Sequence, residues 1–502
     1  GSTCAFLSTI LTNAGYKVGT FTSPHIFEYN ERIKINNHAI TDNELVKYLN
    51  HIIANGDSNL GIFKTFTLAA HLCFMEQKID IAVIEVGIGG AKDTTNLFEP
   101  TISAITGVAL DHCDTLGDTI EKIGLEKSGI YRTNKLAFFG SKQIPASIIN
   151  YAKSIKADLI RLNHEYTIKL HDNGWDFLSQ GLNIYSIPFP NLRGSEQVYN
   201  AALAIAILSK LTSLTPVNSS QIKAGLLQTS LIGRFQVMAG TPQVVMDTAH
   251  NPQAIEIMCE NMLKLGFAKS NAAVFAIAKD KDYKKIIAIA SKYFTKWYIA
   301  PLNSHRDLDL QEVANTLIEH KIKTENILIN TTIAEAFSKA YLQLNNDDRL
   351  VVFGSFITIE QSYLTFSQLR IKQISPQKEI VNRQKKDNTA SRRRLLGGVF
   401  ILFCMLVVLL KVTSNIKPLP INPSVVEIQA NNQAESSLAP TNNNSSDVIA
   451  NNSNRTEQQL ESKDNPELIL NDEVQANTGF KAGVIQRHSD SSMTTQTSTT
   501  QA

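Results

Sequence analysis

Short apolar runs, separated by amphipathic stretches, continue along this chain from its start to about residue 370. Residues 80–86 are almost wholly apolar, as expected of a strand buried on both faces of a parallel sheet. Strands that alternate with helices build mostly parallel sheets through right-handed crossovers, so the predicted fold class is α/β. The expected strands cover residues 18–21, 80–86, 102–107, 244–246, 273–277, 297–300, 327–329 and 350–353; residues 333–344 favour a helix.

The first three residues, Gly1, Ser2 and Thr3, directly precede a helical pattern that places Leu7 and Leu11 on one face. They match the end of a P-loop, in which backbone amides hold phosphate and a hydroxyl binds Mg²⁺. The lysine and earlier glycines of a complete P-loop do not precede them. We therefore expect an N-terminally truncated piece of a longer chain, with poor ATPase activity by itself.

Polar residues stand where the predicted strands of the first part end. Glu85 closes the apolar run at residues 80–86, and a lone buried carboxylate costs several kcal/mol, so it should be paired or bound to metal. Residues 22–25, Thr-Ser-Pro-His, follow one strand, and the pair Asp111 and His112 follows another. Each of these motifs alone is weak evidence for a functional site, because an isolated Asp-His pair is more often structural. Their order along the chain is more specific.

A second group of polar residues follows the predicted strand at 244–246. Asp247 ends that strand, and His250 lies in the turn that comes next. Arg234, within a Gly-Arg-Phe motif, lies just upstream. Ligands of open α/β sheets bind along the carboxyl ends of the strands. The sequence therefore predicts a second set of ligand-binding residues at the edge of another sheet.

Taken in order, these motifs resemble those of the folylpolyglutamate synthase family, which includes the bifunctional dihydrofolate synthases, in the Mur ligase superfamily. The resemblance covers about the first 360 residues. It implies a Mur-type P-loop ATP domain at residues 1–235 and a smaller, Rossmann-like α/β domain at 236–370. The matching motifs begin at residues 1, 22, 30, 85, 93, 111, 126, 194, 233, 247, 280 and 354.

The resemblance implies an ATP-dependent ligase that joins L-glutamate to the γ-carboxylate of a folate, or to dihydropteroate. ATP would first phosphorylate the carboxylate, and the amine of glutamate would then attack the acyl phosphate. A carboxylate approaching ATP is repelled, so such a site needs cations and Lys or Arg side chains around the transferred phosphoryl group. We expect a monomeric catalytic unit that needs ATP and Mg²⁺.

The family motifs also assign roles to individual residues of this chain. Lys127 matches a lysine that is carbamylated in the superfamily, and Asp247 and His250 would act beside it in catalysis. The implied ligands of two Mg²⁺ ions are Ser2, Ser23, Glu85 and His112. The implied ATP contacts are Gly1, Ser2, Thr3, Asn200, Arg234, Asp247 and His250. The implied substrate contacts are Thr22, Ser23, Pro24, His25 and Arg32.

Some positions depart from the family pattern. Lys92 stands where the family has an arginine, which puts one phosphate or substrate contact in doubt, and Lys64 replaces a glutamate. Two alternative functions remain open. One is a Mur-type amino-acid ligase acting on a cell-wall precursor; the other is a catalytically inactive scaffold tethered to a membrane, given the missing P-loop lysine.

The character of the sequence changes after residue 370. Residues 371–394 form a basic linker, and residues 395–411 form an apolar run at the short limit for a transmembrane helix. Residues 412–502 are rich in Asn, Ser, Gln and Thr, which predicts a disordered polar tail. This arrangement resembles the N-terminal half of a SPOR-type cell-division protein. We expect a single-pass inner-membrane protein with cytoplasmic catalytic domains; a buried core helix is the alternative for residues 395–411.

The composition bears on the kind of partner and on the redox compartment. The 48 Lys and Arg residues nearly balance the 46 Asp and Glu residues, so nothing predicts a nucleic-acid partner. The five cysteines form no paired or metal-like spacing, which suits a reducing compartment.

Overall fold

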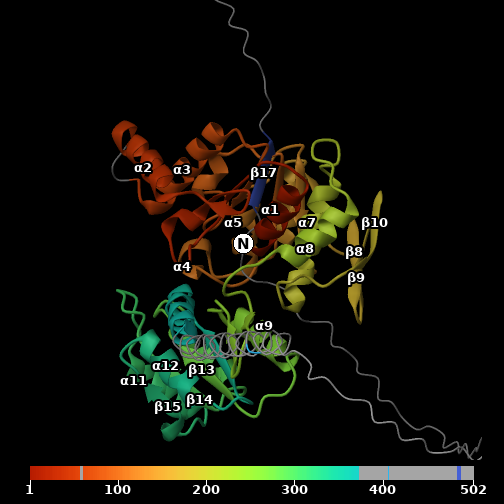
Figure 1. The fold of residues 1–502 in the computed structure, drawn as a ribbon. Helices are drawn as coiled ribbons and strands as arrows, with labels where there is room; N and C mark the ends of the chain where they lie inside the picture. Colours follow the sequence, from red (N-terminus) through yellow and green to blue (C-terminus); the bar gives the residue numbers. More distant parts are fainter. Residues whose placement is uncertain (57–59, 372–404, 406–482, 488–502) are drawn as a thin grey trace, which may run out of the picture. The chain divides into compact units, whose positions relative to one another are not determined.

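The computed structural model describes residues 1–56, 60–371, 405 and 483–487 of the 502-residue chain. Residues 1–372 belong to one compact unit that contains two large sheets. We call the part built on the first large sheet the N-terminal lobe and the part built on the second the C-terminal lobe (Figure 1). The predicted α/β fold class is confirmed.

The sheet of the N-terminal lobe has eight strands in the order β3-β2-β1-β4-β17-β5-β6-β7. β1 is parallel to β4, and β5, β6 and β7 are parallel to one another, whereas β2, β3 and β17 pair antiparallel. The strands are β1 (Val18–Phe21), β2 (Ile33–Ile35), β3 (His38–Ala39), β4 (Ile81–Glu85), β5 (Ile102–Ile105), β6 (Leu136–Phe139), β7 (Asp158–Arg161) and β17 (Gly483–Arg487).

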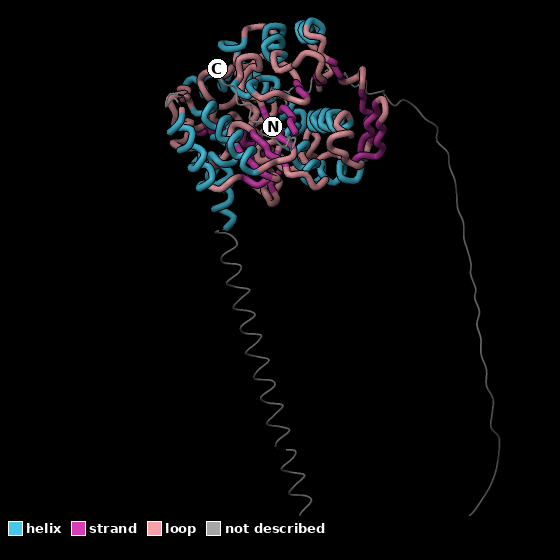
Figure 2. Tube along the Cα trace, turned by 90° about the horizontal axis from the view of Figure 1, so that it is seen from above, coloured by secondary structure: helices cyan, strands magenta, loops and turns pink. Residues whose placement is uncertain are grey.

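Helices cover both faces of this sheet because its strands are apolar on both sides. In β4, Val83 packs in the core that contains α1, α7 and α8, whereas Ile84 packs in the core of α2 and α3. The helices are α1 (Ser2–Asn13), α2 (Asp42–Asn55), α3 (Ile62–Gln77), α4 (Cys113–Leu116), α5 (Ile120–Ser128), α6 (Ala146–Ser154), α7 (Ser195–Ser209) and α8 (Ser219–Gln228). In Figure 2 the helices, in cyan, lie around the strands, in magenta.

A small antiparallel sheet follows β7 along the chain. It consists of β8 (Tyr166–His171), β9 (Gly174–Ser179) and β10 (Leu182–Ile187), in the order β10-β9-β8. Trp175 and Phe177 of β9 are fully buried in the same core as α1 and α7. These three strands were not predicted from the sequence.

The sheet of the C-terminal lobe has six strands in the order β11-β12-β16-β13-β14-β15. All neighbours are parallel except β11 and β12, so the mostly parallel sheet predicted here is confirmed. The strands are β11 (Gln236–Met238), β12 (Gln243–Met246), β13 (Asn271–Phe275), β14 (Lys296–Ile299), β15 (Ile327–Ile329) and β16 (Arg349–Phe353).

Helices also cover both faces of the second sheet. One core is formed with α9 (Pro252–Leu263), α10 (Tyr283–Ala290) and α11 (Leu310–Glu319). The other core is formed with α12 (Ile333–Gln343) and with a last helix at residues 356–371. Every parallel strand of this sheet therefore ends in a loop that leads toward a helix, which is where its functional residues lie.

One prediction for the tail is wrong at residues 483–487, which form strand β17 instead of disordered chain. β17 lies between β4 and β5 and pairs with both, from Gly483 opposite Glu85 to Arg487 opposite Ile81. Without it the facing edges of β4 and β5 would leave backbone N–H and C=O groups unpaired, which is costly inside a sheet. A polar composition does not exclude a short strand where two edges offer hydrogen bonds.

The predicted basic linker at 371–394 and the predicted transmembrane run at 395–411 lie outside the described residues, apart from Ile371 and Met405. Among the residues that the structure describes, no helix is both long enough and apolar enough to cross a membrane.

Candidate active site

The carboxylate of Glu85 lies where β1 and β4 end. The two strands pair in parallel with Phe21 opposite Ile84, so the residues that follow them meet at the same edge of the sheet. The backbone N–H of Ser23 donates a hydrogen bond to Glu85 Oε2 at 3.2 Å. The Glu85 side chain is only 4% exposed. As predicted from its place in the strand, this buried carboxylate is paired.

The second carboxylate oxygen of Glu85 faces the start of α1. The backbone nitrogen of Gly1 donates to Glu85 Oε1 at 2.6 Å. Hydroxyl and carboxylate oxygens are the ligands that Mg²⁺ prefers, so the environment of Glu85 fits a divalent metal ion. Within the described ranges no three His, Cys, Asp or Glu side chains are grouped closely enough to hold a metal by themselves. Such an ion would therefore also need hydroxyl, water or substrate oxygens.

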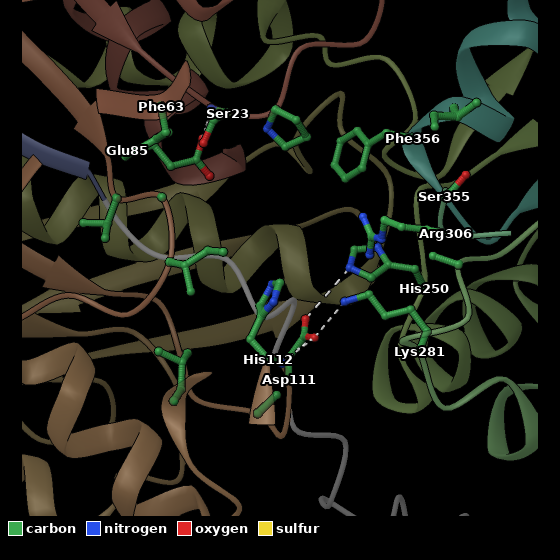
Figure 3. A pocket seen from close by; sticks show the side chains of 18 of the residues that line it. Ser23, Phe63, Glu85, Asp111, His112, His250, Lys281, Arg306, Ser355 and Phe356 are labelled. Atoms are coloured by element: carbon green, nitrogen blue, oxygen red, sulfur yellow. Dashed lines mark hydrogen bonds and ion pairs between the residues drawn. The ribbon is translucent and has the colours of Figure 1, made fainter. Parts of the chain in front are cut away.

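His112, the other proposed metal ligand, comes from the loop after β5. It lines the same pocket as Ser23 and Glu85, but Figure 3 shows it beside Asp111 and apart from Glu85. Its backbone is left-handed, with φ of 52°. Ser2 is buried at the start of α1. The backbone N–H of Ser23 contacts Glu85. The roles of Ser2, Ser23, Glu85 and His112 at a metal stay predictions.

The loop after β4 is held against the end of α5. Backbone N–H groups of Ala91 and Lys92 donate to the carbonyl and carboxylate of Glu126, at 2.9 and 3.1 Å. A Cβ on Gly90 would lie 2.6 Å from the carbonyl oxygen of Lys127, so only glycine allows this approach. Lys127 itself is buried and lines the pocket. The glycine motif and the Glu-Lys motif thus form one structural unit that places Lys127.

The loop between β1 and β2 is shaped by Glu31, whose carboxylate accepts three backbone N–H groups at 2.9 Å. Arg32 Nε donates to His25 Nδ1 at 2.9 Å, so this nitrogen of His25 is unprotonated. Burial and then Arg32 lower the pKa of His25. Arg32 and Pro24 line the pocket, whereas Thr22 and His25 do not. Of the predicted substrate residues, Ser23, Pro24 and Arg32 therefore reach the cavity.

Asp247 supports the turn that carries Arg234. Its carboxylate accepts the backbone N–H groups of Phe235 and Ala249, at 3.0 and 2.8 Å. Burial raises the pKa of Asp247 to about 7, although the nearby Arg234 guanidinium opposes the shift. Arg234 Nη1 donates to Thr248 Oγ1 at 2.9 Å. The motifs at residues 233–235 and 247–250 are therefore joined in space, as their predicted shared role requires.

His250 is held as a neutral imidazole. Its Nδ1 lies 2.7 Å from the carbonyl oxygen of Thr248, which requires the N–H tautomer at this nitrogen. Burial and then the Lys281 ammonium lower the pKa of His250 to about 4. Nε2 is turned toward Asp111, with 3.9 Å between this nitrogen and Asp111 Oδ2. At neutral pH His250 can accept or relay a hydrogen bond but carries no charge.

Asn200 joins α7 to the start of α1. Its Oδ1 accepts from Thr3 Oγ1 at 3.3 Å, and its Nδ2 donates to Gln197 Oε1 at 3.3 Å. The sequence separation of 197 residues between Thr3 and Asn200 shows that two predicted ATP contacts are brought together by the fold. Their role at ATP is not tested by this contact.

These elements enclose a cavity of about 670 Å³ with walls from both lobes, a volume typical of small-molecule sites (Figure 3). Seven predicted site residues line it: Ser23, Pro24, Arg32, Glu85, His112, Lys127 and His250. The other predicted residues lie outside this cavity: Gly1, Ser2, Thr3, Thr22, His25, Asn200, Arg234 and Asp247. Arg234, Asp247 and His250 line a small adjoining cavity with Glu196 and Gln197.

The cavity also has lining residues whose role was not predicted from the sequence. Phe63 and Phe356 add aromatic surface, and Lys281 and Arg306 add positive charge. Lys281 and Phe356 stand in motifs that the family resemblance covers, so that resemblance could have found them. Residues 304–306 carry no such motif, and only the fold brings them to the wall.

Two known domain families match consecutive regions of this chain. Residues 2–208 match the Mur ligase middle domain, and residues 233–356 match the Mur ligase glutamate ligase domain. The dihydrofolate synthase/folylpolyglutamate synthase of Buchnera aphidicola subsp. Schizaphis graminum is 31% identical over 72% of this chain and 84% of its own length. The Escherichia coli protein of the same name is 33% identical over 72% of this chain and 82% of its length. The chain belongs to this family.

Solved structures agree with this assignment. E. coli FolC in complex with DHPP and ADP has a TM-score of 0.68 and 32% identity, and the match covers 74% of this chain and 86% of that one. A bifunctional folylpolyglutamate synthase/dihydrofolate synthase with Mn, AMPPNP and L-glutamate bound has a TM-score of 0.66 at 31% identity, over 73% of this chain and 87% of that one.

Proposed function

We propose that this chain is an ATP-dependent ligase that adds L-glutamate to the γ-carboxylate of a folate, and also to dihydropteroate. The observation that carries the proposal is the cavity that Glu85, Lys127 and His250 line, within a chain of this family. Relatives have been solved with DHPP, with ADP and with L-glutamate, which supports the same substrates here.

The reaction would proceed in two steps. An oxygen of the folate carboxylate attacks the γ-phosphorus of ATP, and the bond to the β-phosphate oxygen breaks to release ADP. The amine nitrogen of glutamate then attacks the acyl carbon, loses a proton, and displaces inorganic phosphate. Both steps bring anions together, so they depend on positive charge fixed in advance around the reacting groups.

The walls of the cavity suit these substrates. Arg32, Lys281 and Arg306 supply positive charge for the carboxylates of folate and glutamate. Phe63 and Phe356 supply aromatic surface of the kind on which a flat pterin ring packs. His250 is neutral at pH 7. It can therefore accept the proton that the attacking amine loses.

ATP would lie at the start of α1, where Ser2 and Thr3 are buried beside Asn200. Backbone N–H groups at a helix N-terminus attract phosphate. Arg234, Asp247 and His250 would reach the nucleotide from the adjoining cavity. A divalent ion at Glu85 would supply charge neutralisation for the phosphates. We assign Mg²⁺ to it, with Ser2, Ser23, Glu85 and His112 as the proposed ligands of two ions.

Lys127 is proposed to carry a carbamate. The ammonium group would first lose one proton. The resulting amine would then add to carbon dioxide, forming an N–C bond and releasing a second proton, so that a cation becomes an anion. A buried lysine beside a site for divalent cations would otherwise repel them, whereas a carbamate would be attracted. This modification is reversible and leaves the lysine side chain otherwise unchanged.

The apolar run at residues 395–411 is proposed to anchor this catalytic unit, acting as a monomer, in the inner membrane. Its support is the sequence alone: Lys411 is the one charged residue in the run, and three arginines directly precede it at 392–394. The resemblance of this region to a SPOR-type protein belongs to the same proposal.

The test is a ligation assay on the full chain with ATP, Mg²⁺ and labelled L-glutamate. Dihydropteroate, tetrahydrofolate and a UDP-muramoyl precursor serve as separate acceptors, and products are identified by mass spectrometry. Arg32→Met should raise the KM for the folate acceptor, whereas Lys339→Met, which breaks an exposed ion pair with Glu335, should not. Glutamate transfer to the UDP-muramoyl acceptor alone, or to none of the three, would overturn the proposal.

A further inference from the structure

Three groups of the C-terminal lobe converge on one carboxylate of the N-terminal lobe. Asp111 follows β5 in the N-terminal lobe. Lys281 Nζ lies 3.0 Å from Asp111 Oδ1, and Asn251 Nδ2 donates to Asp111 Oδ2 at 3.4 Å. His250 Nε2 faces the same oxygen at 3.9 Å (Figure 3). The contacts join residues that are 140 and 170 positions apart in the sequence.

The ion pair between Asp111 and Lys281 is shielded from water. Their side chains are 16% and 11% exposed, whereas the Asp280–Arg306 pair, within the C-terminal lobe, is 42% and 46% exposed. Solvent and salt weaken an exposed pair strongly and a shielded pair much less. Removing one partner of a shielded pair leaves the other charge without compensation, which is costly. The charge of Asp111 and the charge of Lys281 therefore stabilise each other.

The pair joins the two lobes at the wall of the cavity. Ser23, Glu85 and Lys127 reach the cavity from the N-terminal lobe, and His250 and Lys281 reach it from the C-terminal lobe. The rings of Phe27 and Tyr363 also meet, with centroids 5.3 Å apart, but an apolar ring contact is weakly directional. The hydrogen-bonded ion pair fixes both distance and direction.

We propose that Asp111 is a positioning residue that holds the two lobes together and thereby sets Lys281 and His250 at the wall of the cavity. The inference rests on the proposed ligase function for its kinetic consequence, but its structural consequence can be measured independently. Asp111 need not touch a substrate in this role, since it acts through the lysine and the histidine of the opposite lobe.

The experiment measures the distance between the lobes in the full chain by double electron–electron resonance. Spin labels are placed at Lys153→Cys in α6 and Lys264→Cys at the end of α9, both exposed, after Cys113→Ser and Cys404→Ser. Asp111→Asn and Lys281→Met should each broaden and lengthen the distance distribution. The double variant should be no worse than either single variant, because both break one interaction. Lys339→Met is the matched control and should leave the distribution unchanged.

Ligation by the same variants gives a second readout. Each single change should lower kcat by about tenfold, and the double change by the same factor, since residues that act as a unit are not additive. Exchanging the charges, Asp111→Lys with Lys281→Asp, should restore the narrow distance distribution. Lys281→Arg, which keeps the charge, should retain the narrow distance distribution.

Two results would overturn the inference: an unchanged distance distribution in both single variants, or losses that multiply in the double variant. These outcomes are separate from a failure of the proposed function. A wild-type chain that transfers glutamate to no folate acceptor, but whose distance distribution still responds to Asp111→Asn, removes the ligase proposal and keeps the positioning role.

Discussion

The side chain of Glu85 is almost fully buried at the end of its strand. Both of its carboxylate oxygens accept hydrogen bonds. Glu85→Gln keeps the shape of the side chain but removes the negative charge that a divalent cation needs. We expect the affinity for Mn²⁺, measured by electron paramagnetic resonance in the presence of ADP, to fall by at least about tenfold. Glu325→Gln, at a carboxylate that is 74% exposed, is the control. Equal Mn²⁺ affinity in the two variants would remove Glu85 from the metal site.

Lys127 provides a prediction specific to carbamylation. Lys127→Ala should abolish ligation, because the proposed carbamate oxygens are lost, and short carboxylic acids such as acetate should restore part of it by occupying the vacated space. Lys142→Ala, at a lysine whose ammonium lies 5.7 Å from the ring centre of Tyr199, should neither lose activity nor respond to acetate. A Lys127→Ala chain with full activity and no response to acetate would contradict the modification.

His250 makes stability depend on pH. Its pKa in the folded protein is lowered to about 4 from the ordinary 6.5, chiefly by burial. Below pH 6.5 the unfolded chain takes up a proton here, whereas the folded chain does not until about pH 4. The stability associated with neutral His250 is therefore fully present above pH 6.5 and is lost as the pH falls toward 4.

The corresponding variant is His250→Gln, which cannot be protonated. Between pH 7.5 and 4.5 the wild type should lose more free energy of unfolding than the variant, by on the order of 2 kcal/mol. Urea unfolding followed by fluorescence of Trp297, in the core of the C-terminal lobe, measures this difference in a Trp175→Phe background. Parallel pH profiles for the two proteins would show that His250 is not held neutral.

At the scale of single elements, the glycine loop after β4 depends on contact with the end of α5. Gly90→Ala would place a Cβ 2.6 Å from a backbone oxygen of Lys127 and 2.8 Å from that of Glu126. Neither backbone can move cheaply, so we expect a loss of about 1–3 kcal/mol in stability and a higher KM for the folate acceptor. Urea unfolding and ligation kinetics check the two effects.

Gly181→Ala separates this steric effect from backbone strain. Gly181 has a φ of 95° but nothing within 4 Å of an added Cβ. Its replacement should cost only the left-handed backbone penalty of about 1–2 kcal/mol and leave the KM unchanged. If both variants behave alike, the loop is not positioned by its contact with α5.

The elements that could be predicted from sequence are those whose pattern is local. Strands such as β4 and β12 are apolar runs that end in a carboxylate, and the polar ends of β1 and β4 were expected to meet. The antiparallel strands β8 to β10 lack such a run, because only one of their faces is buried. β17 was missed because its pairing depends on two edges about 400 residues earlier in the chain.

At the scale of the whole molecule, the candidate site could be predicted only in part. Glu85, Lys127 and His250 lie in motifs, so their presence at one cavity follows from the resemblance. Arg306 lines the cavity, and Asp111 contacts Lys281, only because the two lobes pack against each other. A local sequence pattern does not predict how two lobes pack. The part of the site made by contact between lobes therefore had to come from the structure.

The charges on either side of the apolar run predict how the whole chain is oriented in the membrane. Residues 392–394 are three arginines before the apolar run 395–411, and Lys411 and Lys417 are the closest positive charges at its other end. The excess of positive charge before the run favours a cytoplasmic N-terminal side. The proposed ligase needs ATP, which gives an independent reason for the same orientation.

We therefore expect the chain to fractionate with membranes, and a reporter that is active only in the cytoplasm to be silent when fused after Thr413. The same reporter fused after Ile371, ahead of the basic linker, should be active and serves as the matched control. Replacing Leu402 and Val407 by aspartate should release the chain from the membrane, because a charge at the centre of a spanning helix is costly. An active reporter after Thr413 in a membrane-bound chain would invert the topology, and a chain found wholly in the soluble fraction would remove the anchor.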